Sequence, residues 1–189
     1  MRFRVLGMVA AAMNIWAAQP PDLADRSVTV CQEGGPETWS TASARAEAAK
    51  IFAEVGVRIQ WRIGFQECAD KHEISIHMSY ETPKTEHPDD WAYAYPYDGV
   101  HIVVFYDRIK NKMGGARASH LLAYVLAHEI THVVQGVARH SESGIMKAAW
   151  NTNDYFDMGQ DRLHFSDLDV ILLYRGLEAR QTLLAAGLQ

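Results

Sequence analysis

The stretch "AHEITHVVQGVARHSESGIM", residues 127–146, holds three histidines, a glutamate between the first two, and a methionine shortly after the third. His128 and His132 are four residues apart inside an apolar helical pattern, so they lie on one face of the helix, one turn apart. Both imidazoles can then bind one tetrahedral Zn²⁺ at about 2.0–2.1 Å. Glu129 is rotated slightly around the helix, where it can act as general base on a zinc-activated water.

A metal-free helix is the alternative, because the H-E-x-x-H pattern also occurs by chance. The rest of this helix is apolar, however, and two buried histidines with a glutamate would be costly to desolvate without a metal. Gly136 ends the helical pattern, so the chain can turn back. His140 follows in that turn, where it could supply a third zinc ligand, and Met146 comes soon after it in the tight turn "SGIM".

The third ligand stays open at this point, because other zinc peptidases use a carboxylate there. We expect His140, and the alternatives lie downstream of it: Glu142, Asp154, Asp157 and His164. The remaining histidines show no ligand spacing and are left outside the site: His72, His77, His87, His101 and His120.

"HEITHVVQGVARHS" followed by "GIM" resembles the metzincin metalloproteases. Their signature is H-E-x-x-H-x-x-G-x-x-H, followed by a turn that carries a methionine beneath the zinc site. This chain has one additional residue on each side of the glycine. The resemblance implies a zinc endopeptidase with His128, His132 and His140 as ligands. It further implies Glu129 as the base and Met146 as the methionine of the turn.

The resemblance extends to the segments that flank the motif. "AKIFAEVGVRIQW" resembles the helix-to-strand junction of such domains, and "WAYAYPYDGVHIVVF" resembles the edge strand and loop that line their substrate cleft. By this analogy the backbone of residues 92–94 pairs with an extended peptide. Tyr93 and Tyr95 could flank the cleft, although aromatic residues in a strand more often serve packing.

Hydrophobic periodicity predicts the elements around the motif. Strands are expected at residues 27–31, 57–63, 72–80, 91–95 and 100–106. Helices are expected at residues 37–56, from Ser119 or a near neighbour to Gly136, and from Ser166 toward the end of the sequence. The first two strands are expected to pair in parallel, because a helix connects them. The order predicts a zincin-like α/β (α+β) fold with a mixed twisted sheet of four to five strands. One backing helix, an active-site helix and a C-terminal helix complete it.

Apolar residues of the C-terminal helix occur at a spacing that suits packing on the core. They are Leu168, Ile171, Leu172 and Leu177.

The N-terminal segment has the composition of a signal peptide. Arg2 and Arg4 precede an apolar stretch of about 14 residues, shorter than the ~20 that span a bilayer. Cleavage is expected near Ala17 or Ala18, which leaves residues 19–189 as a single secreted or periplasmic domain. An uncleaved anchor or a buried first helix is the alternative.

Two cysteines follow that segment, and an even number in an exported chain favours a disulfide between Cys31 and Cys68. The alternative is a free thiol that reversibly binds the zinc. The formal net charge is −5, and no lysine- and arginine-rich run points to a nucleic-acid partner.

The leading prediction is therefore a secreted zinc-dependent endopeptidase. Its partners are a zinc ion and a peptide or protein substrate, with no nucleic acid, no membrane after signal cleavage, and a monomeric state. A zinc-stabilised secreted binding module without turnover is the main alternative. Glu129 speaks against it, because a purely structural zinc site is usually closed by a fourth ligand. A third possibility is a metal-assisted hydrolase of another amide.

Overall fold

The computed structural model describes residues 26–33, 38–64, 68, 72–84, 90–95, 97 and 100–187. The expected signal peptide, residues 1–18, lies outside these ranges, as do His87 and most of the turn at residues 96–99. The assignment of residues 19–189 to one domain therefore stays a prediction. No helix among the described residues is both long and apolar enough to cross a membrane.

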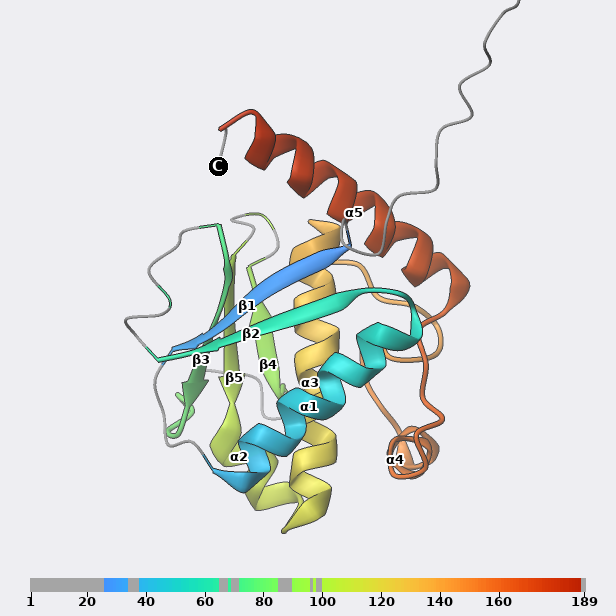
Figure 1. The fold of residues 1–189 in the computed structure, drawn as a ribbon. Helices are drawn as coiled ribbons and strands as arrows, with labels where there is room; N and C mark the ends of the chain where they lie inside the picture. The colour runs from blue at the N-terminus through green and yellow to red at the C-terminus, as the bar shows by residue number, and fades with distance from the viewer. Residues whose placement is uncertain are drawn as a thin grey trace, which may run out of the picture.

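The described strands form one mixed sheet in the order β2-β1-β3-β5-β4. They are β1 (Ser27–Glu33), β2 (Arg58–Ile63), β3 (Ile74–Ser79), β4 (Ala92–Ala94) and β5 (His101–Phe105). Four strands run parallel, and β4 pairs antiparallel with β5 at one edge (Figure 1). The mixed five-stranded sheet agrees with the prediction of four to five strands.

The parallel pairing of the first two strands is confirmed, with Val28 opposite Ile59. Helix α1 (Trp39–Glu54) connects them. It begins at Thr38, which exchanges capping hydrogen bonds with Thr41, and it ends just before Gly56, whose φ of 69° permits the turn into β2.

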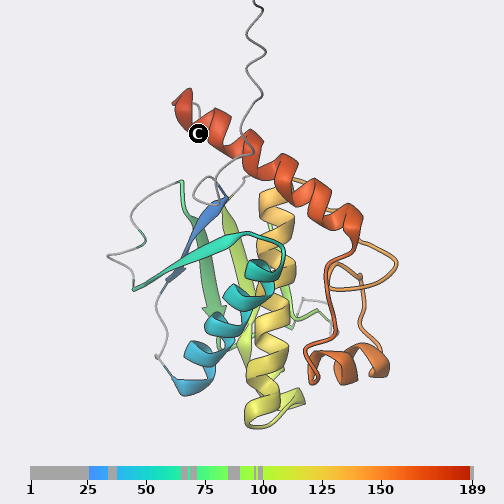
Figure 2. The same cartoon turned by 45° about the vertical axis from the view of Figure 1, so that its right-hand side comes forward.

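Helices α1 and α3 (Ala116–Gln135) lie side by side over one face of the sheet (Figures 1 and 2). Helix α1 is the predicted backing helix, and α3 is the predicted helix that carries His128 and His132. Every residue of α3 from Leu121 to Val134 is buried, so this helix forms the centre of the molecule. Gly136 ends it in the left-handed conformation, at the glycine where the helix was expected to end. The helix begins at Ala116, close to its expected start at Ser119 or a near neighbour.

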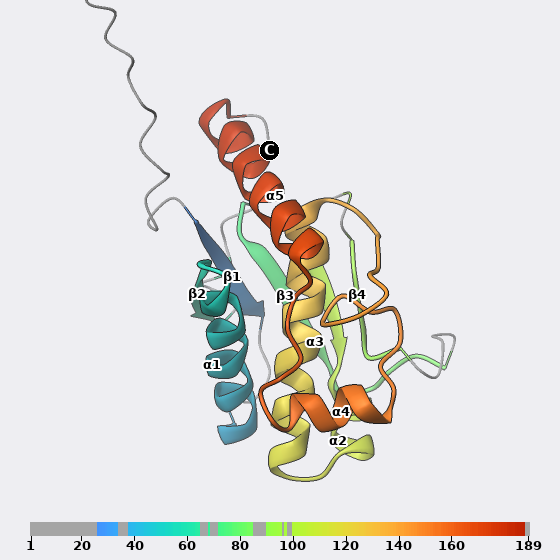
Figure 3. The ribbon, with the colours of Figure 1, turned by 90° about the vertical axis from the view of Figure 1, so that its right-hand side faces the viewer.

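Helix α5 (Asp167–Ala185) crosses the C-terminal part of α3 (Figure 3). Ser166 caps it as expected, but the predicted packing face is partly wrong. Leu168 and Ile171 are each 49% exposed, whereas Leu173 and Leu177 are buried. Apolar residues occur on more than one side of this helix, and the contact with α3 determines which side is covered.

Two short helices were not predicted from the sequence. Helix α2 (Tyr106–Lys112) follows β5 directly and has no side-chain cap, and its first residue was assigned to the strand. Helix α4 (Thr152–Met158) is capped by Asn151. Both helices have only seven residues. Such short helices carry too little periodicity to be distinguished from loops.

The structure contains the predicted disulfide between Cys31 and Cys68. Cys31 is fully buried in β1. The free-thiol alternative is therefore wrong for this structure, and neither cysteine is available as a metal ligand.

Candidate metal centre

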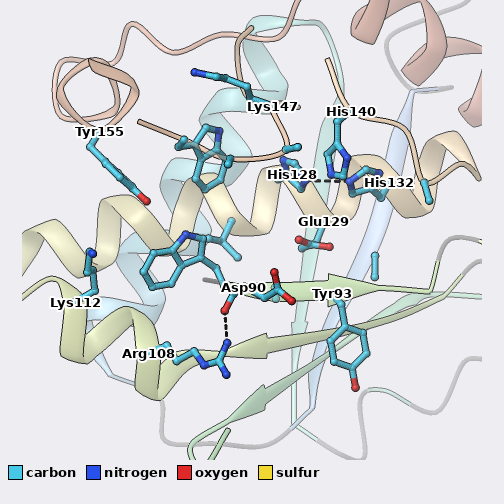
Figure 4. A pocket seen from close by; sticks show the side chains of 18 of the residues that line it. Asp90, Tyr93, Arg108, Lys112, His128, Glu129, His132, His140, Lys147 and Tyr155 are labelled. Atoms are coloured by element: carbon cyan, nitrogen blue, oxygen red, sulfur yellow. Dashed lines mark hydrogen bonds between the residues drawn. The ribbon is translucent and has the colours of Figure 1, made fainter. Parts of the chain in front are cut away.

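Three histidines from two segments of the chain converge at one place. His128 and His132 project from α3, and His140 comes from the segment that follows Gly136 (Figure 4). One ligand atom of each histidine lies within 4.8 Å of those of the other two, so the group could hold a metal ion. The structure thus brings together the three residues that the sequence pattern singled out.

Backbone carbonyls orient the two helical histidines. Nδ1 of His128 donates to the carbonyl of Ile145 at 2.8 Å, and Nδ1 of His132 donates to the carbonyl of Val137 at 3.1 Å. These bonds place the proton of each neutral ring on Nδ1 and leave Nε2 with a lone pair.

The two Nε2 atoms are 3.0 Å apart. Two lone pairs that face each other repel unless a cation lies between them. Two nitrogen ligands of a tetrahedral zinc ion would be about 3.3 Å apart, close to this separation. The donor set therefore fits a zinc ion.

The electrostatic surroundings keep all three imidazoles neutral. Burial and the neighbouring His132 lower the pKa of His128 to about 3. Burial likewise lowers the pKa of His132 and, together with Arg139, that of His140. Neutral imidazole is the form that binds a metal.

His140 is held in place through its neighbours in the chain. Its ring lies 5.3 Å from that of His128, and the two rings are stacked. Arg139 and Ser141 both bond to one carboxylate oxygen of Asp169, at 3.0 and 2.5 Å. Asp169 is completely buried and also bonds Ser166 at the start of α5. A carboxylate of the C-terminal helix thus fixes the segment that carries the third histidine.

Met146 lies in a turn that packs beneath α3. The methionine is fully buried, and its carbonyl accepts a hydrogen bond from the Ser141 backbone at 2.7 Å. Gly144 has a φ of 77°, and a Cβ atom there would lie 2.4 Å from the carbonyl oxygen of His164. Only glycine fits at this point. The adjacent Ile145 supplies the carbonyl that orients His128, so the turn positions a candidate ligand.

Glu129 lies beside the histidines and is only 8% exposed. Burial and the negative charge of Asp90 raise its pKa to about 8, against a hydrogen bond with the Ala94 backbone that lowers it. Its carboxyl group faces the same space as the histidine rings (Figure 4). The edge strand β4, expected to contact the substrate, therefore also contacts this glutamate.

The alternative third ligands lie away from the histidines and are engaged elsewhere. Asp154 pairs with Lys147, Asp157 with Arg162, and His164 with Glu54, while Glu142 is exposed. None of them belongs to the histidine group. Of these candidates among the described residues, His140 is the one that groups with His128 and His132.

A cleft of about 1070 Å³ contains the histidine group and Glu129. Residues 90–94 form one wall and residues 147–150 another. Of the two tyrosines considered as possible flanks of the cleft, Tyr93 lines it, whereas Tyr95 is not among the lining residues and is 47% exposed. This volume is at the upper end for small-molecule sites and suits a segment of several residues.

Several residues of the cleft had not been singled out from the sequence. They are Asp90, Arg108, Lys112, Trp150 and Tyr155. No local signal marked them. Asp90, Arg108 and Lys112 precede the motif helix in sequence, and Trp150 and Tyr155 follow the motif without a spacing typical of ligands. In the sequence, Asp169 is only a residue near the start of the helix expected from Ser166. Its carboxylate could be assigned to the histidine segment only after the fold was known.

His120, which was left outside the site, indeed lies elsewhere. Its Nδ1 atom is 2.7 Å from a carboxylate oxygen of Glu47, and Asp161 is close to both. Asp161 already pairs with Lys50 at 3.0 Å. This surface group contributes nothing to the cleft.

Comparisons with known proteins bear on the fold. No protein-family model matches the chain, and no curated protein matches its sequence. Among solved structures, the chain is similar to the crystal structure of archaemetzincin from Methanopyrus kandleri, with a TM-score of 0.59 and 13% identity. The match covers 84% of this chain and 98% of the archaemetzincin chain. The fold is thus an archaemetzincin-like zincin fold, and the predicted fold class is confirmed.

Proposed function

We propose that this chain is a secreted zinc-dependent endopeptidase. The observation that carries the proposal is the convergence of His128, His132 and His140 beside a buried Glu129 in a large cleft. The likeness of the fold to archaemetzincin supports it.

The donor set favours a catalytic over a structural zinc site. Three imidazoles would hold the ion, and the group contains no fourth protein ligand among the described residues. Structural zinc sites are usually closed by four protein ligands, whereas catalytic sites keep one position open. When bound, zinc supplies Lewis-acid chemistry, since it polarises a carbonyl group and acidifies water.

Glu129 would move the proton in this reaction. Beside a bound zinc ion the ionised form of Glu129 would be favoured, against the burial that raises its pKa. The carboxylate would then take a proton from the attacking water and pass it to the nitrogen of the leaving amine. The Ala94 backbone orients the carboxylate from the edge strand. Met146 supports the site from the buried turn, through the neighbouring carbonyl of Ile145, which holds His128.

Secretion is part of the proposal. The signal-like segment at residues 1–18 supports it, and the disulfide between Cys31 and Cys68 is typical of an oxidising compartment. The substrate would be a peptide or an unfolded protein that enters the cleft as an extended strand, and the enzyme would act as a monomer.

The alternative is a zinc-stabilised binding module without turnover. A module of this kind has no need for a buried carboxylic acid beside the metal, because the group is costly to desolvate. The burial of Glu129 therefore favours the enzyme.

The decisive experiment is cleavage of an unfolded protein by the zinc-loaded chain, in parallel with its Glu129→Ala and Glu142→Ala variants. We expect cleavage by the wild type and by Glu142→Ala, because Glu142 is an exposed glutamate outside the histidine group. We expect no cleavage by Glu129→Ala or after chelation. A chain that binds one zinc firmly and cleaves nothing would instead support the binding module.

A further inference from the structure

The two ends of the cleft differ in chemistry. The histidines and Glu129 lie toward one end, and Lys112 and Tyr155 lie toward the other, remote end (Figure 4). Asp90 and Arg108 lie between them and are joined by a hydrogen bond. A buried carboxyl group thus accompanies the candidate metal centre, and the cationic side chains of α2 extend from the middle of the cleft to the remote end. A substrate in the cleft would contact both ends.

Helix α2 positions the two cations. Arg108 and Lys112 are four residues apart and therefore lie on the same face of the helix, which is turned toward the cleft. The Arg108 guanidinium donates to the carbonyl of Asp90 at 2.8 Å and lies 4.8 Å from the centre of the Phe105 ring. These contacts fix its position at the wall of the cleft.

Lys112 differs from the other lysine of the cleft. Lys147 is paired with Asp154 at 2.5 Å, so its charge is compensated. Lys112 is exposed, and none of the described residues forms an ion pair with it. Its ammonium group is therefore available to a ligand that enters this end.

Tyr155 lies across the cleft from Lys112 (Figure 4), whereas the Trp150 ring lies 5.6 Å from the His128 ring, at the metal end. Lys112 is exposed, so solvent and salt screen its charge, and a moderate, salt-sensitive attraction for an anion is expected. The anionic group that an unmodified peptide offers is a carboxylate.

We infer that the α2 end of the cleft binds a carboxylate of the substrate through Lys112 and Arg108, and that the enzyme selects peptides that carry one near the cleaved bond. The inference rests on the proposed function, because it assigns a specificity to the same cleft. The carboxylate can belong to an acidic side chain or to the C-terminus of the peptide.

An extended peptide advances about 3.3 Å per residue. The histidines and Lys112 line the same cleft, so the carboxylate is expected within a few residues of the bond held at the histidines. The positions to be tested are the three on either side of that bond.

Peptides that scan these positions test the inference. One series has blocked ends and carries glutamate, glutamine or lysine at each of the three positions on either side of the bond. A second series differs only in a free or amidated C-terminus. We expect a carboxylate at one position to raise kcat/KM about three- to tenfold over its neutral counterpart. The responding series identifies whether the source is a side chain or the C-terminus.

Charge-reversal variants assign the effect to Lys112. In Lys112→Glu the preference is expected to disappear or to change to lysine. Lys110→Glu is the control, because it makes the same charge change on the same helix at a residue that does not line the cleft. The preference of this variant for acidic peptides is expected to equal that of the wild type. High salt should weaken the wild-type preference.

Two failures remain distinguishable. If the wild type cleaves peptides with glutamate and lysine equally well, or if both variants behave alike, the inference is wrong and the peptidase is retained. If no peptide is cleaved, the proposed function fails. In that case the Kd values of the zinc-loaded chain for the same peptides, measured by fluorescence anisotropy, still test the carboxylate site. Equal Kd values for acidic and neutral peptides would overturn it.

Discussion

His140 is the most exposed of the three converging histidines, and no hydrogen bond among the described residues fixes its ring. Backbone carbonyls orient His128 and His132, so those two rings are already arranged for a metal. His140 depends on the segment around it for its position. This residue therefore decides whether the site has three protein ligands or two.

Replacement of His140 by alanine is expected to lower the zinc affinity about 100-fold or more, since the loss of a ligand exceeds the 10–100-fold effect of losing an outer hydrogen bond. His164→Ala provides the control, because His164 is an exposed histidine that pairs with Glu54. Competition with a chromophoric chelator measures both affinities. Equal affinities in the two variants would exclude His140 as a ligand.

At the scale of the helices and turns, Asp169 connects α5 to the histidine segment. Asp169→Asn removes the charge that pairs with Arg139 while keeping the shape of the side chain. We expect a loss of about 1.5–3 kcal/mol in the free energy of unfolding, because the buried carboxylate loses its charge-assisted hydrogen bonds while Arg139 stays 34% exposed. We also expect a lower zinc affinity than in the wild type, because His140 lies in sequence between Arg139 and Ser141, which both bond to Asp169.

The matched control for Asp169→Asn is Asp157→Asn. Asp157 pairs with Arg162 on the surface, where both side chains are well exposed. Loss of this ion pair should lower the free energy of unfolding by less than about 1 kcal/mol and leave the zinc affinity unchanged. Urea unfolding of the zinc-free chains gives the two energies. A similar small loss in both variants would contradict the role assigned to Asp169.

The crossing of α5 over α3 depends on a glycine. A Cβ atom at Gly176 would lie 2.0 Å from the carbonyl oxygen of Val134, a backbone atom that cannot move aside. Gly176→Ala is expected to cost about 1–3 kcal/mol or more by overpacking. At Gly159 the nearest atom is 3.5 Å away and φ is −67°, so Gly159→Ala should be tolerated. Thermal unfolding of the two variants compares them, and equal Tm values would show that α5 does not pack as described.

The histidine helix could be predicted from the sequence because its signal is local. Four-residue spacing alone places His128 and His132 on one face, and Gly136 ends the helix where the pattern stops. The cleft could not be predicted in the same way. Helices α2 and α4 are too short for periodicity, and Asp169 reaches the site from a position remote in sequence. Long-range packing, rather than propensity, brings these groups together.

At the scale of the whole molecule, the stability of the fold at acidic pH depends on the carboxylate of Asp169. Burial raises the pKa of Asp169, but hydrogen bonds from Ser141, Ser166 and Arg139 outweigh burial and lower the pKa below its usual value. A group whose pKa is lowered by folding stabilises the folded state above its unfolded pKa, near 3.9. That stability is lost as the pH falls through the folded pKa. Between pH 7 and pH 3, the zinc-free wild type should therefore lose more unfolding free energy than Asp169→Asn. Parallel losses in urea titrations would contradict this.

The most direct measurement is zinc K-edge X-ray absorption of the chain loaded with one equivalent of zinc. We expect three imidazole nitrogens at about 2.0–2.1 Å, one further light ligand and no sulfur. That result would establish His128, His132 and His140 as an open catalytic-type site. Fewer than three imidazoles, or no stoichiometric zinc, would contradict the proposed metal centre and with it the peptidase.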